Sequence, residues 1–533
     1  MGSKSTKSEI QERLDALQEI SVELMTSRTL GDTLTLIVNK AVDLLLCDGG
    51  SLYLKSDKDL LVFEVAVNRS VAIDFRRQMI PIDSQGLAAY SFRTGQSLNL
   101  RDVQEIGPED PYCFDDSFDR AMTYRTRSVL TQPLKSSKGE KLGVIQLINR
   151  KRSRQNAWPS TDAKQISRMP LFDEDDARLL ESFAAVASAA IEKAQLYRDI
   201  ENLFEGFVKA SVQAIEARDL TTRGHSDRVA VLTVALAEHV SRSQEPALRD
   251  LYFNDTQLAE IRYASLLHDF GKIGVKESTL QKQEKLSLVQ RLEIELRFER
   301  FKRASETQVL REYINRLLKD AKAPNQLEIA RIERQIRDFG LQIDDYWRQI
   351  LALNRPAVMD GGEQPSLDQL AQISHLDCEG HSHSLLAPTE IQSLRILRGS
   401  LTKEERIEIE SHVVHTYEFL RKIPWTRELA RVPEIAYAHH ERLNGTGYPR
   451  GVLAPEIPFQ SRMMAICDVF DALVASDRPY KQAIPVAKAL DILDQEAKRN
   501  QLDPSFLKVF VEARIYELAE FTDMQKLRPK KAA

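Results

Sequence analysis

Residues Glu434–Pro449 read EIAYAHHERLNGTGYP, an apolar helical stretch that ends in the pair His439–His440 and continues into a glycine-containing loop. A second stretch, YASLLHDFGKIG over Tyr263–Gly274, has the same form and ends in the pair His268–Asp269. Burying a polar side chain such as these imidazoles and this carboxylate costs about 1 to 3 kcal/mol for each polar group that lacks a hydrogen-bond partner. A bound metal ion would supply the partners, so both stretches predict ligands of a metal centre held between helices.

Three further segments of this helical half offer the same ligand types. They contain His225 in GHSDRV, His412 in IESHVV and Asp468 in ICDVFDAL. A single histidine on an apolar helix is more often a core residue than a ligand, and only the set as a whole argues for a metal. Imidazole and carboxylate together suit a divalent transition metal, and a carboxylate such as Asp269 can bridge two ions. Five histidines and two aspartates are enough for two ions.

The motif His439–Pro449 resembles HHExxDGxGYP, which defines the HD-GYP branch of the HD phosphohydrolases, and it matches seven of the eight fixed positions. The resemblance extends from about Glu216 to Tyr516 and implies an all-α domain. It implies seven metal ligands: His225, His268, Asp269, His412, His439, His440 and Asp468. It also implies catalytic roles for Asp269 and Lys272, and it implies that the substrate binds Lys272, Gly445, Tyr448, Arg478 and Lys481.

Two positions depart from that family pattern. Asn444 stands where the motif usually has aspartate, and we expect the exchange to be tolerated because asparagine also favours turns. Thr221 stands where some members have a glutamate that binds a third metal. We therefore expect two divalent ions, and the resemblance implies that they are iron or manganese.

The resemblance implies a phosphodiesterase that opens cyclic di-GMP, and with a two-metal site we expect linear pGpG as the main product, with GMP as the product of a further cut left open. A preference for cyclic GMP-AMP is an alternative. A catalytically silent sensor that binds a dinucleotide and acts through a partner is another, but degenerate members lose ligands and this chain keeps all seven. A general nucleotide phosphohydrolase would explain the HD pair but not HHERLNGTGYP.

The spacing of the ligands predicts an insertion in the helical domain. Asp269 and His412 lie 143 positions apart, whereas the family separates them by a few tens of residues. The charged stretch at about 288–400 begins with a pattern typical of a helical hairpin broken near Ala323–Asn325. Its segment HLDCEGHSH (375–383) fits an exposed polar loop better than a second metal site, because no further ligand pair accompanies it.

The N-terminal part alternates between helical and strand-like patterns. A helical pattern is followed by SLYLK, LLVFEVAV, SLNL, SVLTQPL and KLGVIQLIN, which predict the antiparallel sheet of an α+β domain. Residues 124–151 and MPLFDEDD (169–176) resemble the NKFDE motif of GAF domains, so we assign a GAF domain to residues 12–195. The resemblance implies a small regulatory ligand, such as a cyclic nucleotide, near Asn149 and Asp173.

A helical pattern without proline runs over residues 176–219 and connects the two domains. Its apolar positions form a longer stripe than one neighbouring domain usually covers. We expect this helix to pair with its copy in a homodimer and to carry signals from the GAF domain to the enzyme.

Composition limits the partners and the compartment. A net charge of −5 over 533 residues argues against DNA or RNA as a partner. Four dispersed cysteines fit a reducing compartment, and no apolar run approaches the roughly 20 residues that cross a bilayer. The N-terminus lacks the apolar stretch of a signal peptide, so we expect a cytoplasmic protein without a membrane span.

Overall fold

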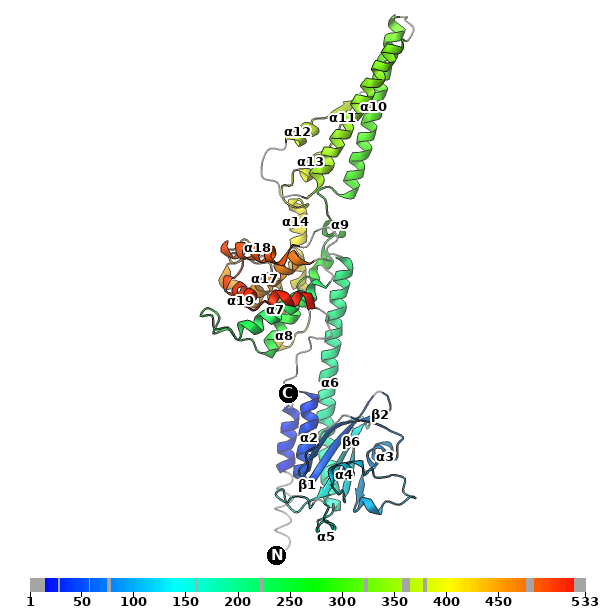
Figure 1. Cartoon of the computed structure of the whole chain (residues 1–533), viewed down its shortest axis with the longest axis vertical. Coiled ribbons are helices and arrows are strands. Elements are labelled where there is room, and N and C mark those ends of the chain that lie inside the picture. Colours follow the sequence, from blue (N-terminus) through cyan, green and yellow to red (C-terminus); the bar gives the residue numbers. More distant parts are fainter. Residues whose placement is uncertain are drawn as a thin grey trace. The chain divides into compact units, whose positions relative to one another are not determined.

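The computed structural model describes residues 15–26, 29–56, 58–73, 78–159, 161–219, 224–320, 325–356, 365–376, 381–475 and 484–521. The chain divides into two compact units, Met1–Glu205 and Gly206–Ala533. Figure 1 shows the helices and strands of both units, which are described separately below.

A six-stranded antiparallel sheet forms the centre of the N-terminal unit, with the strand order β3-β2-β1-β6-β5-β4. The strands are β1 (Cys47–Lys55), β2 (Leu60–Asn68), β3 (Met79–Pro81), β4 (Leu98–Leu100), β5 (Val129–Lys135) and β6 (Lys141–Arg150). The sequence patterns predict all of them except β3, whose three residues Met79–Pro81 are all apolar and show no alternation with polar residues. The α+β architecture is the one predicted.

Helices cover both faces of this sheet. On one face, helix 15–26, α2 (Leu30–Leu44) and the start of α6 (Glu174–Arg218) pack on β1, β5 and β6 and form the main core (Figure 1). On the other face, Phe92 of α3 (Leu87–Thr94) joins Tyr53 and Val144 in a smaller core. The shorter helices of this unit are η1 (Val103–Glu105), α4 (Ser117–Met122) and α5 (Ala163–Ile166).

Helix α6 is the longest element, with 45 residues. Asp173 precedes it, and its Oδ1 accepts a hydrogen bond of 2.8 Å from the backbone N–H of Asp176, which stabilises the first turn. Leu196, Ile200 and Leu203 are between 52% and 77% exposed in this chain. Among the described residues, no helix combines the length and the apolar character that crossing a bilayer requires.

The C-terminal unit is built mainly from helices, as predicted. A first group places the candidate site residues: α7 (His225–Val240), α8 (Asp255–Leu267), η3 (Phe270–Gly274), α15 (His412–Leu420), α16 (Val432–Tyr437) and α17 (Phe459–Val474). The others around them are α9 (Glu277–Leu280), α14 (Lys403–Glu410), η4 (Arg427–Leu429), η5 (Ala454–Glu456), α18 (Val486–Lys498), α19 (Pro504–Glu512) and η6 (Ile515–Phe521).

Between α9 and α14 lies the long segment that the ligand spacing marks as an insertion. Helices α10 (Leu288–Asp320) and α11 (Gln326–Asn354) run side by side (Figure 1), and Asn325 caps α11 by accepting from two backbone N–H groups. The segment also contains α12 (Pro365–Ala371), β7 (Ser374–Leu376), β8 (Ser382–Ser384) and α13 (Pro388–Leu394). It has a hydrophobic core of its own, in which Phe298 packs on Trp347 with ring centroids 5.4 Å apart.

Candidate metal centre

The seven predicted ligands come from five separate segments, and most of them lie at the ends of helices. Helix ends bring these side chains to one place while the apolar faces of the helices stay in the core. His225 begins α7, His268 and Asp269 lie between α8 and η3, His412 begins α15, His439 and His440 follow α16, and Asp468 lies within α17.

Two carboxylates lie among the histidines. Asp269 lies with Oδ1 3.3 Å from His412 Nε2 and with Oδ2 3.5 Å from His268 Nε2. Asp468 lies with Oδ1 3.1 Å from His225 Nε2 and with Oδ2 3.8 Å from the nearer ring nitrogen of His440. Counting His225 beside Asp269 and His268 beside Asp468, each at 3.9 Å, each carboxylate faces three imidazoles, and the structure brings these predicted residues into one largely buried cluster.

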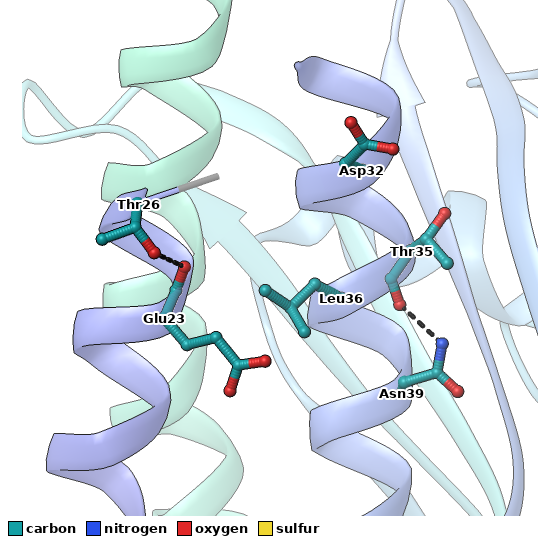
Figure 2. A pocket seen from close by; sticks show the side chains of 6 residues that line it. All are labelled: Glu23, Thr26, Asp32, Thr35, Leu36 and Asn39. Atoms are coloured by element: carbon teal, nitrogen blue, oxygen red, sulfur yellow. Dashed lines mark hydrogen bonds between the residues drawn. The ribbon is translucent and has the colours of Figure 1, made fainter. Parts of the chain in front are cut away.

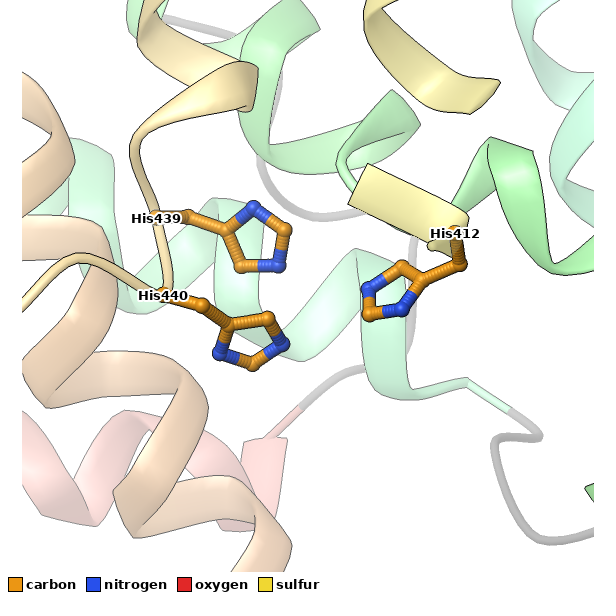
Figure 3. Close-up of side chains that lie close together, drawn as sticks. All are labelled: His412, His439 and His440. Atoms are coloured by element: carbon orange, nitrogen blue, oxygen red, sulfur yellow. The ribbon is translucent and has the colours of Figure 1, made fainter. Parts of the chain in front are cut away.

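Three histidines are oriented by the same local hydrogen bond. In His268, His412 and His439, Nδ1 lies 2.6 to 2.7 Å from the backbone carbonyl three residues earlier. Because a carbonyl only accepts, each Nδ1 must carry the proton and each Nε2 must present a lone pair. Figure 3 shows His412, His439 and His440 converging from two parts of the chain, and their rings lie 4.0 to 5.8 Å apart.

These buried lone pairs have no hydrogen-bond donor. Among the residues that the structure describes, Nε2 of His268, His412 and His439 makes no hydrogen bond. For His268 and His412, the nearest charged group is the Asp269 carboxylate, which is itself an acceptor. Acceptors that face one another across about 3.4 Å need a cation between them. The cluster therefore fits a metal ion.

Two groups within the cluster have metal-ligand spacing. The donor atoms of His412, His439 and His440 lie within 4.8 Å of one another, and so do those of His225, His268 and Asp269. Nitrogen and carboxylate donors suit divalent transition metals. The role of each residue as a ligand stays a prediction, but the arrangement has room for the two ions that the sequence implies.

The pKa values of the histidines in the first group favour metal binding. Burial lowers the pKa of His412, lowers that of His440 to about 3 and holds that of His439 well below its usual value. All three imidazoles are therefore neutral near pH 7. Neutral imidazole is the form that binds a metal.

The charged members behave differently. Burial would lower the pKa of His225, but its hydrogen bonds to Asp468 and Asp471 outweigh burial and raise the pKa to about 9. Burial would raise the pKa of Asp269, yet Lys272 and the neighbouring histidines hold it well below its usual value. Asp269 is thus ionised at neutral pH, and His225 carries a proton on the nitrogen that an ion would take.

One supporting residue is absent from the sequence prediction. Asp471, buried in α17, accepts a 2.7 Å hydrogen bond from His225 Nδ1 and hydrogen bonds of 2.6 and 3.0 Å from Arg228. A carboxylate behind a metal-binding histidine orients the ring and makes it a better ligand. Its position three residues after Asp468, on the same face of a helix, is a signal that could have identified it.

Gly271 explains how η3 reaches α15. A Cβ atom at this position would lie 1.9 Å from the carbonyl oxygen of His412, and its N–H donates to Thr416 Oγ1 at 2.8 Å. No residue with a side chain allows this approach. The glycine of the HDFGK segment therefore permits Asp269 and His412 to come together.

Lys272, predicted to contact phosphate, lies at the edge of the cluster. Its Nζ is 2.8 Å from Asp269 Oδ2 and 3.1 Å from Asp219 Oδ2. The other two predicted phosphate contacts, Arg478 and Lys481, lie outside the described residues, and so does Thr221.

The loop after His440 is held by a buried carboxylate. Glu441 accepts hydrogen bonds from the backbone N–H groups of Arg450 and Val452 at 2.8 and 3.2 Å. This closes the loop and brings the Tyr448 ring to 4.7 Å from the His440 ring. Gly445 has a φ of +75°, which favours glycine. Both residues predicted to bind substrate thus lie in a loop tied to the cluster.

Asn444 has a structural role in the same loop. Its Oδ1 accepts from Thr446 N and Thr446 Oγ1 at 3.2 and 2.7 Å, and its Nδ2 donates to the carbonyl of Arg499 at 3.2 Å. Aspartate could make the first two contacts but not the third. The departure from the family motif is therefore compatible with this turn.

In the N-terminal unit, the two predicted ligand contacts are occupied by the protein itself. Asn149 is fully buried and bonds the backbone N–H of Arg127 and the hydroxyl of Tyr124 at 2.7 and 2.8 Å, while Asp173 caps α6. A surface hollow of about 470 Å³ lies elsewhere, beside helix 15–26 and α2 (Figure 2). It is lined by Glu23, Thr26, Asp32, Thr35, Leu36 and Asn39. A role of Asn149 or Asp173 in ligand binding stays a prediction.

Comparison with known families assigns a domain to each part. Residues 29–191 match the GAF domain family, and residues 376–506 match the HD domain family. The chain thus has an N-terminal GAF domain and a C-terminal HD domain, as the motifs indicate. The HD match begins after His225, His268 and Asp269, and the tertiary structure places these three residues beside the matched part.

Relatives of the C-terminal part are known. The chain is 42% identical over 106 residues, 20% of its length, to 3'3'-cGAMP-specific phosphodiesterase 3 of Vibrio cholerae. It is 32% identical over 171 residues (29% of its length) to the cyclic di-GMP phosphodiesterase response regulator RpfG of Xanthomonas campestris, and 36% identical over 114 residues (21%) to a cyclic di-GMP phosphodiesterase of Thermotoga maritima. These matches span 22%, 44% and 30% of the relatives' own lengths.

Proposed function

We propose that this chain, with its GAF domain and its HD domain, is a metal-dependent phosphodiesterase that hydrolyses cyclic di-GMP to pGpG and then, in a slower second cut, to GMP. The observation that carries the proposal is the buried cluster itself. It combines five histidines with two carboxylates and leaves three imidazole lone pairs without a donor. Structural histidines would be satisfied within the protein.

The chain's own residues set up the chemistry. Two divalent ions, held by the seven cluster residues, would supply a water that ionises near neutral pH and a Lewis acid for the phosphoryl oxygens. Asp269 lies within 3.9 Å of ring nitrogens of His225, His268 and His412, which belong to both groups, so its carboxylate would help to hold the ions. Lys272 offsets the negative charge that develops on the phosphoryl group. Tyr448 packs its ring against that of His440, with the centroids 4.7 Å apart.

The dinucleotide is proposed from the relatives. Two of the three relatives above are named for cyclic di-GMP, which supports that substrate, whereas the relative with 42% identity is named for 3'3'-cGAMP. Cyclic GMP-AMP is therefore the second candidate. The metals are proposed to be iron or manganese from the resemblance to HD-GYP proteins, because mixed nitrogen and carboxylate donors suit divalent transition metals in general and the affinity order alone would favour copper or zinc.

A turnover assay tests the function. The full chain is loaded with Fe²⁺ or Mn²⁺ and given equal concentrations of cyclic di-GMP or cyclic GMP-AMP, and the products are separated by chromatography. We expect pGpG from the first substrate at a higher kcat/KM than any product from the second. The reverse order would make cyclic GMP-AMP the substrate, and binding without turnover under both metals would make the chain a sensor.

Regulation by the GAF domain is the second part of the proposal. A small ligand of that domain would change turnover in the HD domain through α6. Adding cAMP or cGMP to the assay is expected to change kcat by a few fold, whereas no response to either would remove cyclic nucleotides as the ligand.

A homodimer formed through α6 is the third part. The exposed residues Leu196, Ile200 and Leu203 are spaced by four and three positions, the spacing of a coiled-coil seam. We expect Leu203→Glu to convert a dimer into a monomer in sedimentation equilibrium. Glu201→Lys, which changes a charge beside the seam, serves as the control, and a wild-type monomer would contradict the expectation.

A further inference from the structure

The C-terminal end of α6 is tied to η3, the short helix that follows the HD pair. Arg218, its last residue, donates hydrogen bonds to the backbone carbonyls of Ile273 and Val275, the second at 2.8 Å. Asp219 comes next and continues the helical hydrogen bonding through its N–H to the carbonyl of Ile215. Two consecutive residues at the end of α6 thus contact the η3 region.

Asp219 also reaches the metal cluster through one intermediate side chain. Its carboxylate holds Lys272 Nζ at 3.1 Å, and the same Nζ lies 2.8 Å from Asp269 Oδ2. The side chains of Asp219, Lys272 and Asp269 are only 5%, 15% and 6% exposed. Salt bridges this well shielded are weakly screened and keep a defined geometry.

The geometry leaves Lys272 one further donor. A lysine ammonium has three N–H donors, and the two carboxylates use two of them. With two donors held, the direction of the third is fixed as well. Without Asp219, the ammonium would pivot about its single contact with Asp269, and the third donor would lose its direction.

We infer that Asp219 is a positioning residue, which holds Lys272 so that its third N–H faces a phosphoryl oxygen of the bound substrate. The inference rests on the proposed phosphodiesterase function and assigns a role to the end of α6 within it. Arg218 supports the arrangement by fixing the backbone of η3, to which Lys272 belongs. A displacement of the end of α6 would therefore change catalysis although it touches no metal ligand.

Asp219→Ala and Asp219→Asn in the full chain test this role. Misplacing a catalytic group by about 1 Å can lower the rate on the order of 100-fold, so we expect kcat for cyclic di-GMP to fall about 10- to 100-fold in the alanine variant. KM should stay within about threefold, because positioning in the transition state affects kcat more than binding. Asparagine keeps an oxygen that accepts from Lys272 and should restore most of the lost rate.

Metal binding is measured in the same variants by electron paramagnetic resonance of Mn²⁺. All seven cluster residues remain, so the number of ions bound should equal that of the wild type. The spectrum of bound Mn²⁺ should change in Asp219→Ala, because Lys272, the cation in contact with Asp269 Oδ2, is no longer held in place by Asp219. Glu260→Gln is the matched control: Glu260 is buried in the same unit and accepts from the backbone N–H of Arg431, and this variant should leave kcat and the spectrum unchanged.

The outcomes separate this inference from the proposed function. If the wild type hydrolyses cyclic dinucleotides but Asp219→Ala retains its kcat within about twofold, or loses kcat only in proportion to lost metal or folded protein, the positioning role is wrong. If the wild type hydrolyses none of them, the proposed function fails. The Mn²⁺ spectrum then decides whether Asp219 still acts on the site, and an unchanged spectrum would overturn the inference.

Discussion

The GAF domain and the HD domain each contain a buried polar cluster, and the two clusters differ in one respect. In the GAF domain, the Asp48 carboxylate accepts from Ser70 Oγ and the Tyr124 hydroxyl at 2.7 Å each and lies 3.3 Å from Lys151 Nζ. Asn149 Nδ2 donates in turn to the Tyr124 hydroxyl at 2.8 Å. The charge of Asp48 is balanced, and its oxygens all have donors.

The cluster of the HD domain is also largely buried, but the protein does not satisfy all of its polar atoms. Nε2 of His268, His412 and His439 has no donor among the described residues, and the Asp269 carboxylate faces two of these atoms. A complete network rigidifies a fold, whereas an incomplete one costs stability unless a ligand completes it. Both clusters are buried and charged, so these properties do not distinguish them. The candidate functional cluster is identified by hydrogen-bond acceptors that have no donor and converge on one point.

The largest expected effect comes from removing the central carboxylate of the incomplete cluster. We expect Asp269→Ala to lower kcat for cyclic di-GMP by about 10³-fold or more, because it removes both the carboxylate proposed to hold the ions and the partner of Lys272. Turnover and bound metal are measured together, the latter by elemental analysis. Wild-type turnover in a variant that binds no metal would end the metal-dependent proposal.

Two alanine variants, one in each cluster, test the difference between the two clusters directly. His439→Ala should weaken metal binding by about 100-fold or more. Removing a metal ligand lowers the affinity at least as much as removing a residue that hydrogen-bonds to a ligand, which typically lowers it about 10- to 100-fold. Its effect on the stability of the metal-free protein should be smaller than that of Asn149→Ala, since His439 loses only the hydrogen bond from Nδ1 to the Ala436 carbonyl, whereas Asn149 loses three. Asn149→Ala should lower the free energy of unfolding by about 1 to 3 kcal/mol, because Tyr124 loses a partner, and should not affect metal binding.

Titration calorimetry with Mn²⁺ and thermal unfolding with and without chelator provide the two measurements for this pair. If the metal-free protein were as strongly destabilised by His439→Ala as by Asn149→Ala, the two clusters would both be structural.

A smaller effect is expected one step away from the ligands. Asp471→Asn leaves all seven cluster residues intact but weakens the hold on His225, so metal affinity should fall about 10- to 100-fold. Asp494→Asn, which removes an exposed salt bridge to Lys498, should have no effect on affinity. Equal affinities in both variants would show that Asp471 only stabilises the fold.

The smallest expected effect concerns the loop that departs from the family motif. Asn444→Asp keeps the contacts with Thr446 and loses only the hydrogen bond to the Arg499 carbonyl. A partly exposed hydrogen bond contributes about 1 kcal/mol, so a small loss of thermal stability and a kcat within about threefold of the wild type are expected. A gain of tenfold or more in kcat would instead make this carboxylate part of the catalytic site.

Local patterns determined the fold class and most of the elements. Alternation identified the longer strands of the GAF domain, and apolar residues at helical spacing identified α6 and the α10–α11 hairpin, because these signals lie in neighbouring residues. The three-residue strand β3 was missed because its pairing with β2 is decided by contact. Of the expected ligand contacts in the GAF domain, Asn149 and Asp173 have structural partners that only the folded chain reveals.

The sequence by itself determined the residue types of the candidate centre, since the HD pair, the HHERLNGTGYP motif and the isolated His225, His412 and Asp468 are all visible in it. Only the tertiary structure decided that Asp269 meets His412 across the insertion, that Asp471 supports His225 and that Asp219 holds Lys272. The physical reason is that a side chain's chemistry is local, whereas its partners are chosen by packing between segments far apart in the chain. Gly271 illustrates both points. The sequence shows that this residue is glycine, but only the contact between η3 and α15 shows why a side chain would not fit there.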